Sequence, residues 1–222
     1  MLHKLQYISQ GSTPDIHIQN IEAALNAGVK LIQLRLKNIS DDNYASYGMK
    51  AKELCKTFGA QLIINDNTSV AKMCDADMLH LGLDDMKVVE AKKLIPNKII
   101  GGTANTFEHI QQRCSEKVDY IGLGPFQFTT TKEKLSPVLG AKGYEEIIKK
   151  MRQLSATELV EVPIYAIGGI ELKDIQSIIH TGVYGIAVSG LITNSTNKEH
   201  LVKEINKILG FDSAQPSKKN LI

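Results

Sequence analysis

Short apolar segments rich in β-branched residues alternate with longer amphipathic segments along almost the whole chain. The short segments predict strands at Leu5–Ser9, Lys30–Arg35, Gln61–Asn65, Met78–Leu81, Lys98–Gly101, Tyr120–Gly124, Pro163–Ile167 and Tyr184–Val188. The longer segments predict helices at Ile16–Ala27, Asp41–Thr57, Ser69–Cys74, Lys87–Leu94, Thr106–Cys114, Gly143–Leu154, Leu172–His180 and Lys198–Leu209. Strands that alternate with helices form a parallel sheet, and eight such units allow the sheet to close. We therefore expect an α/β fold, a single (β/α)8 TIM barrel.

Residues at the predicted helix ends support this pattern. Gly28 and Gly182 follow the first and seventh helices, where glycine commonly ends a helix. Asp41 and Asp42 begin the second helix, where the helix dipole favours negative charge. The third helix is the weakest prediction because it is short. An open, doubly wound sheet is the alternative, but the first strand–helix turn lacks the glycine fingerprint of dinucleotide-binding folds.

Composition fits one soluble domain. The chain has 222 residues, of which 43% are hydrophobic, and its net charge of +2 gives no reason to expect a nucleic-acid partner. Its three cysteines form no pattern typical of disulfide frameworks or zinc sites.

The sequence contains neither a signal peptide nor a membrane-spanning segment, so we expect a cytoplasmic protein. Residues 1–210 are expected to form the barrel and 211–222 a polar tail without assigned chemistry.

Two cations follow the second predicted strand. Gln33, Arg35 and Lys37 alternate and therefore share one face, whereas the intervening residues are apolar. Arginine and lysine together suit a phosphate or pyrophosphate. A structural network of salt bridges with carboxylates of the barrel is the alternative.

Carboxylates follow the next two strands. Asn65-Asp66 ends the third strand, and Asp84 and Asp85 follow the fourth. Because the carboxyl ends of adjacent parallel strands meet at one edge, Asp66 and Asp85 could share a Mg²⁺ ion with phosphate oxygens. Each aspartate could instead cap the helix that follows it.

Polar residues also follow the fifth and sixth strands. Thr103 and Asn105 offer hydrogen bonds to a heterocycle, although Asn105 could cap the next helix. His80, within the fourth strand, is expected to be a packed or hydrogen-bonded core residue. The loop after the sixth strand is long and contains hydroxyls beside a lysine, which suit an oxyanion. These residues are Thr129, Thr130, Thr131 and Lys132.

Glycines follow the last two strands. Gly168-Gly169 comes after the seventh strand, and Ser189-Gly190 after the eighth. Loops at these two positions form the recurrent phosphate site of such barrels, because glycine lets backbone N–H groups approach the ligand. Their joint placement predicts a second phosphate site.

These motifs, in this order, resemble the thiamine-phosphate synthase (thiamine-phosphate pyrophosphorylase) family from about Leu5 to Leu209. The matching segments are Gln33-Leu34-Arg35-Leu36-Lys37, Asn65-Asp66, His80-Leu81-Gly82-Leu83-Asp84-Asp85, Gly124-Pro125 followed by Thr129-Thr130-Thr131-Lys132, and Ala166-Ile167-Gly168-Gly169-Ile170. The resemblance implies a Mg²⁺-dependent transferase of thiamine biosynthesis. Such an enzyme joins a hydroxymethylpyrimidine diphosphate to a thiazole phosphate, carboxylated in some members, and releases pyrophosphate.

The resemblance also implies roles for individual residues. The pyrimidine diphosphate would contact Gln33, Arg35, Lys37, Asn65, Thr103 and Lys132, and the charges of Arg35, Lys37 and Lys132 would promote catalysis. Mg²⁺ would bind Asp66 and Asp85, with Asp85 preferred over Asp84 by its spacing from Gly82. The thiazole substrate would contact Thr129, Thr130 and Thr131, and its phosphate would contact Gly169, Ser189 and Gly190.

This chain departs from the family pattern at two positions. Gly190 stands where the family often has serine, which leaves a backbone N–H but no hydroxyl. Thr103 replaces a common serine and keeps the hydroxyl. Neither change excludes the activity.

Three other functions remain open from the sequence. A thiazole tautomerase would share the barrel but usually carries a histidine where this chain has Pro125. A phosphate-ligand sensor would bind without turnover or Mg²⁺ dependence. An isomerase of sugar or indole phosphates would need a carboxylate or lysine base at a strand end. The sequence leaves the oligomeric state open, and a homo-oligomer is compatible with it.

Overall fold

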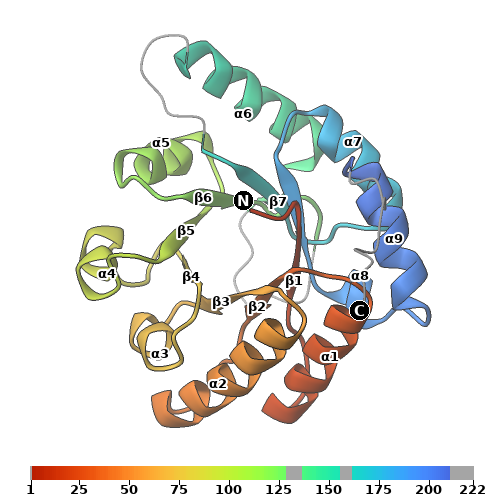
Figure 1. Ribbon diagram of the computed structural model, residues 1–222. Coiled ribbons are helices and arrows are strands. Elements are labelled where there is room, and N and C mark those ends of the chain that lie inside the picture. Colours follow the sequence, from red (N-terminus) through yellow and green to blue (C-terminus); the bar gives the residue numbers. More distant parts are fainter. Residues whose placement is uncertain (1, 129–136, 156–161, 211–222) are drawn as a thin grey trace, which may run out of the picture.

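The structure, a computed structural model, describes residues 2–128, 137–155 and 162–210. The strands β1 to β8 are parallel and form a closed barrel in chain order, surrounded by helices (Figure 1). They are Leu5–Ile8, Leu31–Leu34, Gln61–Asn65, Met78–Leu81, Ile99–Ala104, Tyr120–Leu123, Ile164–Ile167 and Gly185–Val188. The helices α1 to α9 are Pro14–Asn26, Asp41–Thr57, Thr68–Met73, Val88–Leu94, Phe107–Ser115, Gly140–Ser155, Ile175–His180, Gly190–Thr193 and Lys198–Ile208. The predicted (β/α)8 barrel is confirmed, and the open sheet is excluded.

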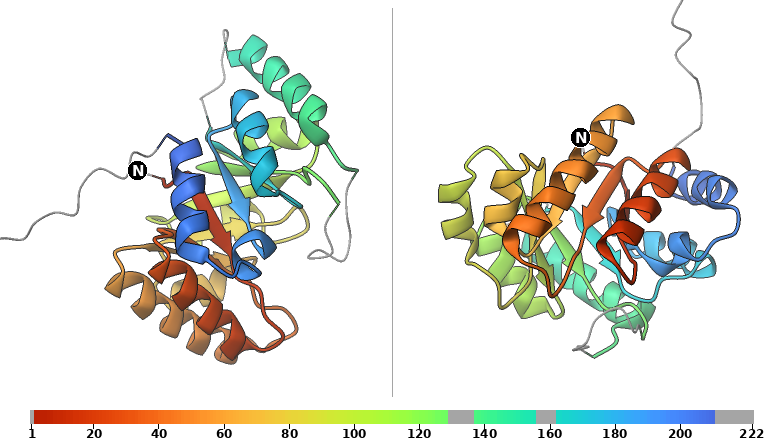
Figure 2. Two further views of the ribbon diagram at one scale, coloured as in Figure 1. Left: turned by 90° about the vertical axis from the view of Figure 1, so that its right-hand side faces the viewer. Right: turned by 90° about the horizontal axis from the view of Figure 1, so that it is seen from below.

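The closure joins the first strand to the last. β1 pairs with β8 through Leu5 and Ile186, and with β2 through Gln6 and Leu31. Figure 2 shows β1 beside the C-terminal strand and helices from the side. The residues after each strand are therefore brought to one mouth of the barrel.

Alternate residues of each strand pack on different sides of the sheet. One set packs against the helices and forms the larger core, which includes Ile32, Leu62 and Ile121. The other set forms a smaller cluster within the barrel. Its buried members are Ile8, Leu31, Ile63, Met78, Tyr120, Tyr165 and Ala187.

Two glycines explain why the fifth strand is longer than the sequence predicts. Glycine is unfavourable in strands, so the prediction ended at Gly101. A Cβ atom at Gly101 would lie 2.0 Å from the Tyr120 ring, and one at Gly102 would lie 2.7 Å from the Arg113 side chain. These glycines make room for neighbours inside β5, so Thr103 lies within the strand rather than after it.

Two helical segments also differ from the prediction. The seventh predicted helix is divided into a 3-10 turn, Leu172–Asp174, and α7, because Glu171 and Asp174 form a capping box around that turn. The short α8 follows Ser189 and was not predicted, since four residues carry no helical periodicity. Both segments lie beside the predicted phosphate loops.

Other details agree with the sequence. Gly28 and Gly182 adopt left-handed backbone angles, with φ of 99° and 97°, after their helices. The third helix is the short α3, as expected. None of the helices that the structure describes has both the length and the apolar character needed to cross a membrane. The predicted tail, 211–222, lies outside the described residues.

The first residues of the chain hold the barrel at the end opposite the mouth. The Tyr165 hydroxyl donates to the His3 carbonyl oxygen at 2.6 Å, and the Tyr184 hydroxyl donates to the Leu2 carbonyl oxygen. The Lys4 ammonium donates to the Leu209 carbonyl oxygen at 3.0 Å, which ties β1 to the end of α9. These bonds connect the two ends of the chain through the base of the sheet.

We expect Tyr165→Phe to lower the free energy of unfolding by about 1 kcal/mol, because it removes a partly buried hydrogen bond. The midpoint of thermal unfolding should fall by roughly 2–4 °C. Tyr47→Phe is the matched control, since the Tyr47 hydroxyl bonds to Asp15 on the surface and should contribute little. Equal melting temperatures for Tyr165→Phe and the wild type would contradict this prediction.

Candidate active site

The cationic and acidic motifs meet at the mouth of the barrel. The Lys37 ammonium, after β2, forms an ion pair with the Asp66 carboxylate, after β3. The side chains are 51% and 25% exposed, so the pair borders solvent and can reach a ligand. The salt bridge considered as the alternative for Lys37 is present, and it joins the two predicted clusters.

The aspartates do not cap helices. Asn67, not Asp66, caps α3, and its side chain accepts a hydrogen bond from the Val70 N–H at 2.9 Å. Asp66 instead takes a left-handed backbone angle, φ 64°, which is uncommon outside glycine. Lys87 occupies the N-cap of α4, and Asp85 accepts from the Gly82 N–H at 2.6 Å. The alternative interpretation of Asp66 and Asp85 as helix caps is therefore excluded.

The two carboxyl groups interact directly. Burial, a hydrogen bond with Asp66 and the negative charge of Asp66 raise the pKa of Asp85 to about 6. The pKa of Asp66 is lowered: burial alone would raise it, but hydrogen bonds from Lys37 and Asp85 and the charge of Lys37 outweigh that effect. At neutral pH two carboxylates thus lie against each other with one lysine beside them. This arrangement favours an additional cation.

The two carboxylates fit a cation whose other ligands are water and substrate oxygens rather than protein side chains. Within residues 2–128, 137–155 and 162–210, no three His, Cys, Asp or Glu side chains gather as a metal cage. Two carboxylates at an open mouth are instead typical of Mg²⁺ sites completed by water and phosphate oxygens. Asp66 and Asp85 could hold such an ion.

Amide side chains line the barrel below these charges. Gln33 donates through Nε2 to the Asn65 Oδ1 at 2.6 Å, and it accepts from the Gln6 amide. Gln33 is only 2% exposed and Asn65 6%. Asn65 therefore lies beside Asp66 at the mouth, with Gln33 beneath it.

Arg35 is held near the end of β1. Its backbone N–H donates to the Ser9 Oγ at 3.0 Å, and the same oxygen lies 2.7 Å from the His17 Nδ1 on α1. Ser9 and His17 are buried. The path of the chain through Arg35 is thereby fixed between β1 and β2.

Thr103 and His80 form a pair inside the barrel. The His80 Nε2 lies 3.0 Å from the Thr103 Oγ1, and its Nδ1 lies 3.1 Å from the Tyr120 hydroxyl. His80 is thus a buried, hydrogen-bonded residue, as expected. Its partner is nevertheless a predicted ligand contact, so His80 helps to orient that hydroxyl.

Asn105 does not cap the next helix, which was the alternative to a ligand contact, and its side chain bonds to the backbone of another segment. Thr106 caps α5, while the Asn105 amide donates to the Gly124 carbonyl oxygen. This bond ties the end of β5 to the start of the loop after β6.

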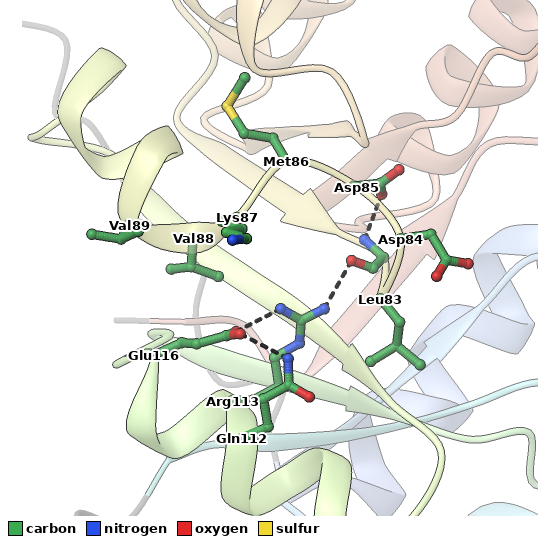
Figure 3. Close-up of a pocket in the computed structure, with 11 residues that line it drawn as sticks. Leu83, Asp84, Asp85, Met86, Lys87, Val88, Val89, Gln112, Arg113 and Glu116 are labelled. Carbon is green, nitrogen blue, oxygen red and sulfur yellow. Dashed lines mark hydrogen bonds and ion pairs between the residues drawn. The ribbon is translucent and has the colours of Figure 1, made fainter.

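Arg113, on α5, holds the ends of β4 and β5 together (Figure 3). Its guanidinium donates to the Gly82 and Thr103 carbonyl oxygens at 2.8 and 3.0 Å, and pairs with Glu116 at 2.7 Å. The side chain is 3% exposed and borders a pocket of about 330 Å³ beside the mouth. Asp85 bonds to the N–H of Gly82, and Arg113 bonds to the carbonyl oxygen of the same residue. Arg113 therefore supports the segment that carries Asp85.

The predicted phosphate loops lie on adjacent strands. Gly168 and Gly169 have φ of 94° and 69°, and a Cβ atom at Gly169 would lie 2.7 Å from the Phe128 carbonyl oxygen. After β8, the Ser189 hydroxyl donates to the Gln10 Oε1 at 3.1 Å, and Gly190 begins α8. Glycine is thus required at Gly169, both by its left-handed backbone angle and by the close approach of the loop after β6.

The loop after β6 is described in part. Phe126 is buried and its ring contacts the Tyr144 ring edge-on, with 5.7 Å between centroids. Phe128, by contrast, is 72% exposed. Thr129, Thr130, Thr131 and Lys132 lie outside the described residues.

Comparison with known proteins identifies the family. The profile of the thiamine monophosphate synthase family matches residues 7–192. This chain belongs to that family. A thiamine-phosphate synthase of Flavobacterium psychrophilum is 52% identical over 210 residues, which cover 94% of this chain and 100% of that protein. A Bacteroides fragilis thiamine-phosphate synthase is 41% identical over 208 residues, covering 93% and 98%. The family predicted from the ordered motifs is confirmed.

Solved structures support the same conclusion. The thiamine phosphate pyrophosphorylase of Pyrococcus furiosus superposes with a TM-score of 0.78 at 27% identity, covering 93% of this chain and 95% of that one. A 3-hexulose-6-phosphate synthase reaches 0.70 at 13% identity, which shows only the shared barrel.

We expect Arg113→Met to lower the free energy of unfolding by about 3 kcal/mol, because it leaves Glu116 and two carbonyl oxygens without their buried partner. Urea denaturation would measure the change. Gln112→Met is the matched control: Gln112 is an exposed neighbour on the same helix, and its loss should change stability by about 0.5 kcal/mol or less. The prediction fails if both variants unfold at the same urea concentration.

Proposed function

We propose that the protein joins a hydroxymethylpyrimidine diphosphate to a thiazole phosphate and releases pyrophosphate, as a Mg²⁺-dependent thiamine-phosphate synthase. The observation that carries this proposal is the contact between Lys37, Asp66 and Asp85 at one mouth of the barrel. The reaction is proposed from the family to which the chain belongs. The position of the diphosphate is proposed from the cluster of charged side chains.

The pyrimidine diphosphate is proposed to lie across the ends of β2 to β5. Arg35 and Lys37 pair with its phosphate oxygens, and Asn65 and Thr103 offer neutral hydrogen bonds. Gln33 is nearly enclosed, so it acts mainly by supporting Asn65. Lys132 adds a third positive charge in the segment outside the described residues.

Asp66 and Asp85 are the proposed ligands of Mg²⁺. A divalent cation held by these two carboxylates would relieve their mutual repulsion at neutral pH. When bound, the ion neutralises charge on the leaving pyrophosphate. Lys37 pairs with Asp66, and its positive charge partly offsets the negative charge of the two carboxylates.

The thiazole phosphate is proposed to bind at β7 and β8. Gly169, Ser189 and Gly190 present backbone N–H groups there, on the same mouth as the diphosphate site. Thr129, Thr130 and Thr131 are proposed to contact the thiazole ring.

The reaction requires no protein nucleophile. The bond between the pyrimidine methylene carbon and the diphosphate oxygen breaks, and the aminopyrimidine stabilises the resulting cation. The thiazole nitrogen then uses its lone pair to form the new carbon–nitrogen bond. Arg35, Lys37 and Lys132 stabilise the negative charge that develops on pyrophosphate, and the barrel mouth holds the two substrates in line.

The competing functions make different predictions in one experiment. Purified protein would be incubated with the pyrimidine diphosphate, the thiazole phosphate and Mg²⁺, and pyrophosphate release would be followed. We expect release that needs both substrates and stops when the metal is chelated. Binding without release would favour a sensor, and isomerisation of the thiazole alone would favour a tautomerase.

Adjacent aspartates provide a matched test of the metal site. We expect Asp85→Asn to raise the Mg²⁺ concentration needed for half-maximal rate by about tenfold or more, because one of two carboxylate ligands is lost. Asp84→Asn should leave it unchanged, since Asp84 is exposed and is not a proposed ligand. Similar Mg²⁺ dependence in the two variants would remove Asp85 from the site.

The cytoplasmic location stays a prediction from the sequence, as does the absence of nucleic-acid and membrane partners, and the sequence is compatible with a homo-oligomer.

A further inference from the structure

Gln6, on β1, is the first member of a chain of amides inside the barrel. It is 2% exposed, and its Nε2 donates to the Gln33 Oε1. Gln33 in turn donates through its Nε2 to the Asn65 Oδ1 at 2.6 Å. We call these three residues the amide relay. It runs from within the sheet to the mouth, where Asn65 precedes Asp66.

The register of the strands creates the relay. Gln6 pairs with Leu31, and Gln33 lies two residues further along β2. Gln33 pairs with Ile63, and Asn65 lies two residues further along β3. Because alternate residues share a face, all three amides point into the barrel, each a step nearer the mouth than the one before.

The relay has a direction. A primary amide accepts through its oxygen and donates through its NH₂ group. Since Gln6 donates to the oxygen of Gln33, the NH₂ group of Gln33 must face Asn65, and Asn65 must accept through its oxygen. The Asn65 NH₂ group has no partner among the described residues, so it is the end of the relay that a ligand can meet. If the Gln33 amide were rotated by half a turn, its oxygen would face Asn65. Asn65 would then have to donate to it, and the Asn65 oxygen would face the ligand.

A contribution to the stability of the barrel does not explain why a glutamine occupies position 6. Its Oε1 is buried and has no hydrogen-bond partner within residues 2–128, 137–155 and 162–210. An unsatisfied buried acceptor is destabilising, and an apolar residue at this position would avoid that cost. A residue retained at such a cost is a candidate for a functional role.

We propose that Gln6 is a positioning residue for the pyrimidine diphosphate. It fixes the orientation of the Gln33 and Asn65 amides so that the mouth presents an N–H donor, which suits the anionic oxygens of a diphosphate. An inverted relay would present a carbonyl oxygen and repel them. This inference rests on the proposed function, and it assigns to Gln6 a role without ligand contact.

The test compares binding of the two substrates to a near-isosteric variant. Gln6→Met keeps the length of the side chain and removes the donor. We expect the dissociation constant of the pyrimidine diphosphate with Mg²⁺, measured by calorimetry, to rise about fivefold, the equivalent of one hydrogen bond. The KM of the thiazole phosphate should stay within about twofold, because the amide relay runs from β1 through β2 to β3 and makes no bond to the loops after β7 and β8.

Gln61→Met is the matched control. Gln61 begins β3 at the other end of the barrel, and its Oε1 is likewise buried without a partner among the described residues. The same chemical change there should leave the affinity for the pyrimidine diphosphate at the wild-type value. An equal loss of affinity in Gln61→Met would mean that the effect does not depend on the amide relay, and it would overturn the proposal.

A double-variant cycle tests whether Gln6 acts through Gln33. If it does, adding Gln6→Met to Gln33→Met should change the dissociation constant by less than about twofold. Additive losses, or an unchanged affinity in Gln6→Met alone, would overturn the proposal.

Should Gln6→Met not fold, Gln6→Leu carries the same expectations. In the wild type, the side-chain amide protons of Gln33 should exchange slowly with solvent, and rapid exchange would also overturn the relay.

The wild-type protein separates this proposal from the proposed function. If it neither binds the pyrimidine diphosphate nor releases pyrophosphate, the proposed function fails, and the role of Gln6 fails with it. If it does both while Gln6→Met binds normally, only the role of Gln6 is excluded.

Discussion

Pairing of β1 with β8 closes the sheet, and the geometry of the site follows from that closure. A closed parallel sheet has no edge, so its only openings are the two ends of the barrel. The first residues of the chain hold one end through Tyr165 and Tyr184. The other end receives every segment that follows a strand. Residues separated by much of the sequence, such as Lys37 and Asp85, are therefore brought within reach of one ligand.

The interior of the barrel combines polar and apolar side chains. Inward positions of β1 to β5 carry the amide relay, His80 and Thr103 as well as apolar residues, and β6 and β7 contribute Tyr120 and Tyr165. Polar groups in such a place are tolerated because most of them bond to one another. The same bonds fix their directions before a substrate arrives. This kind of preorganisation is what a reaction without a protein nucleophile requires, since catalysis then depends on charge and position.

The charges at the mouth remain partly unsatisfied. Asp66 has Lys37 as its counterion, but Asp85 shares the same small volume and keeps a raised pKa. Arg113 supports the backbone under Asp85 without approaching its carboxylate, since Glu116 and two carbonyl oxygens occupy its guanidinium. The backbone of the site is thus supported by hydrogen bonds, and its two neighbouring carboxylates share Lys37, which suits a metal bound together with a diphosphate.

The sequence by itself determined the barrel, the order of its units and the motif positions, because hydrophobic periodicity and strand-end placement are local properties. It left open whether Asp66 and Asp85 cap helices, since a cap and a ligand use the same residue type; the structure assigns the α3 cap to Asn67. It also missed Gln6 and Arg113. Their importance depends on which side chains meet across strands, and that is set by the register and closure of the sheet. Only the tertiary structure decided those contacts, because the interacting atoms belong to segments far apart in the chain.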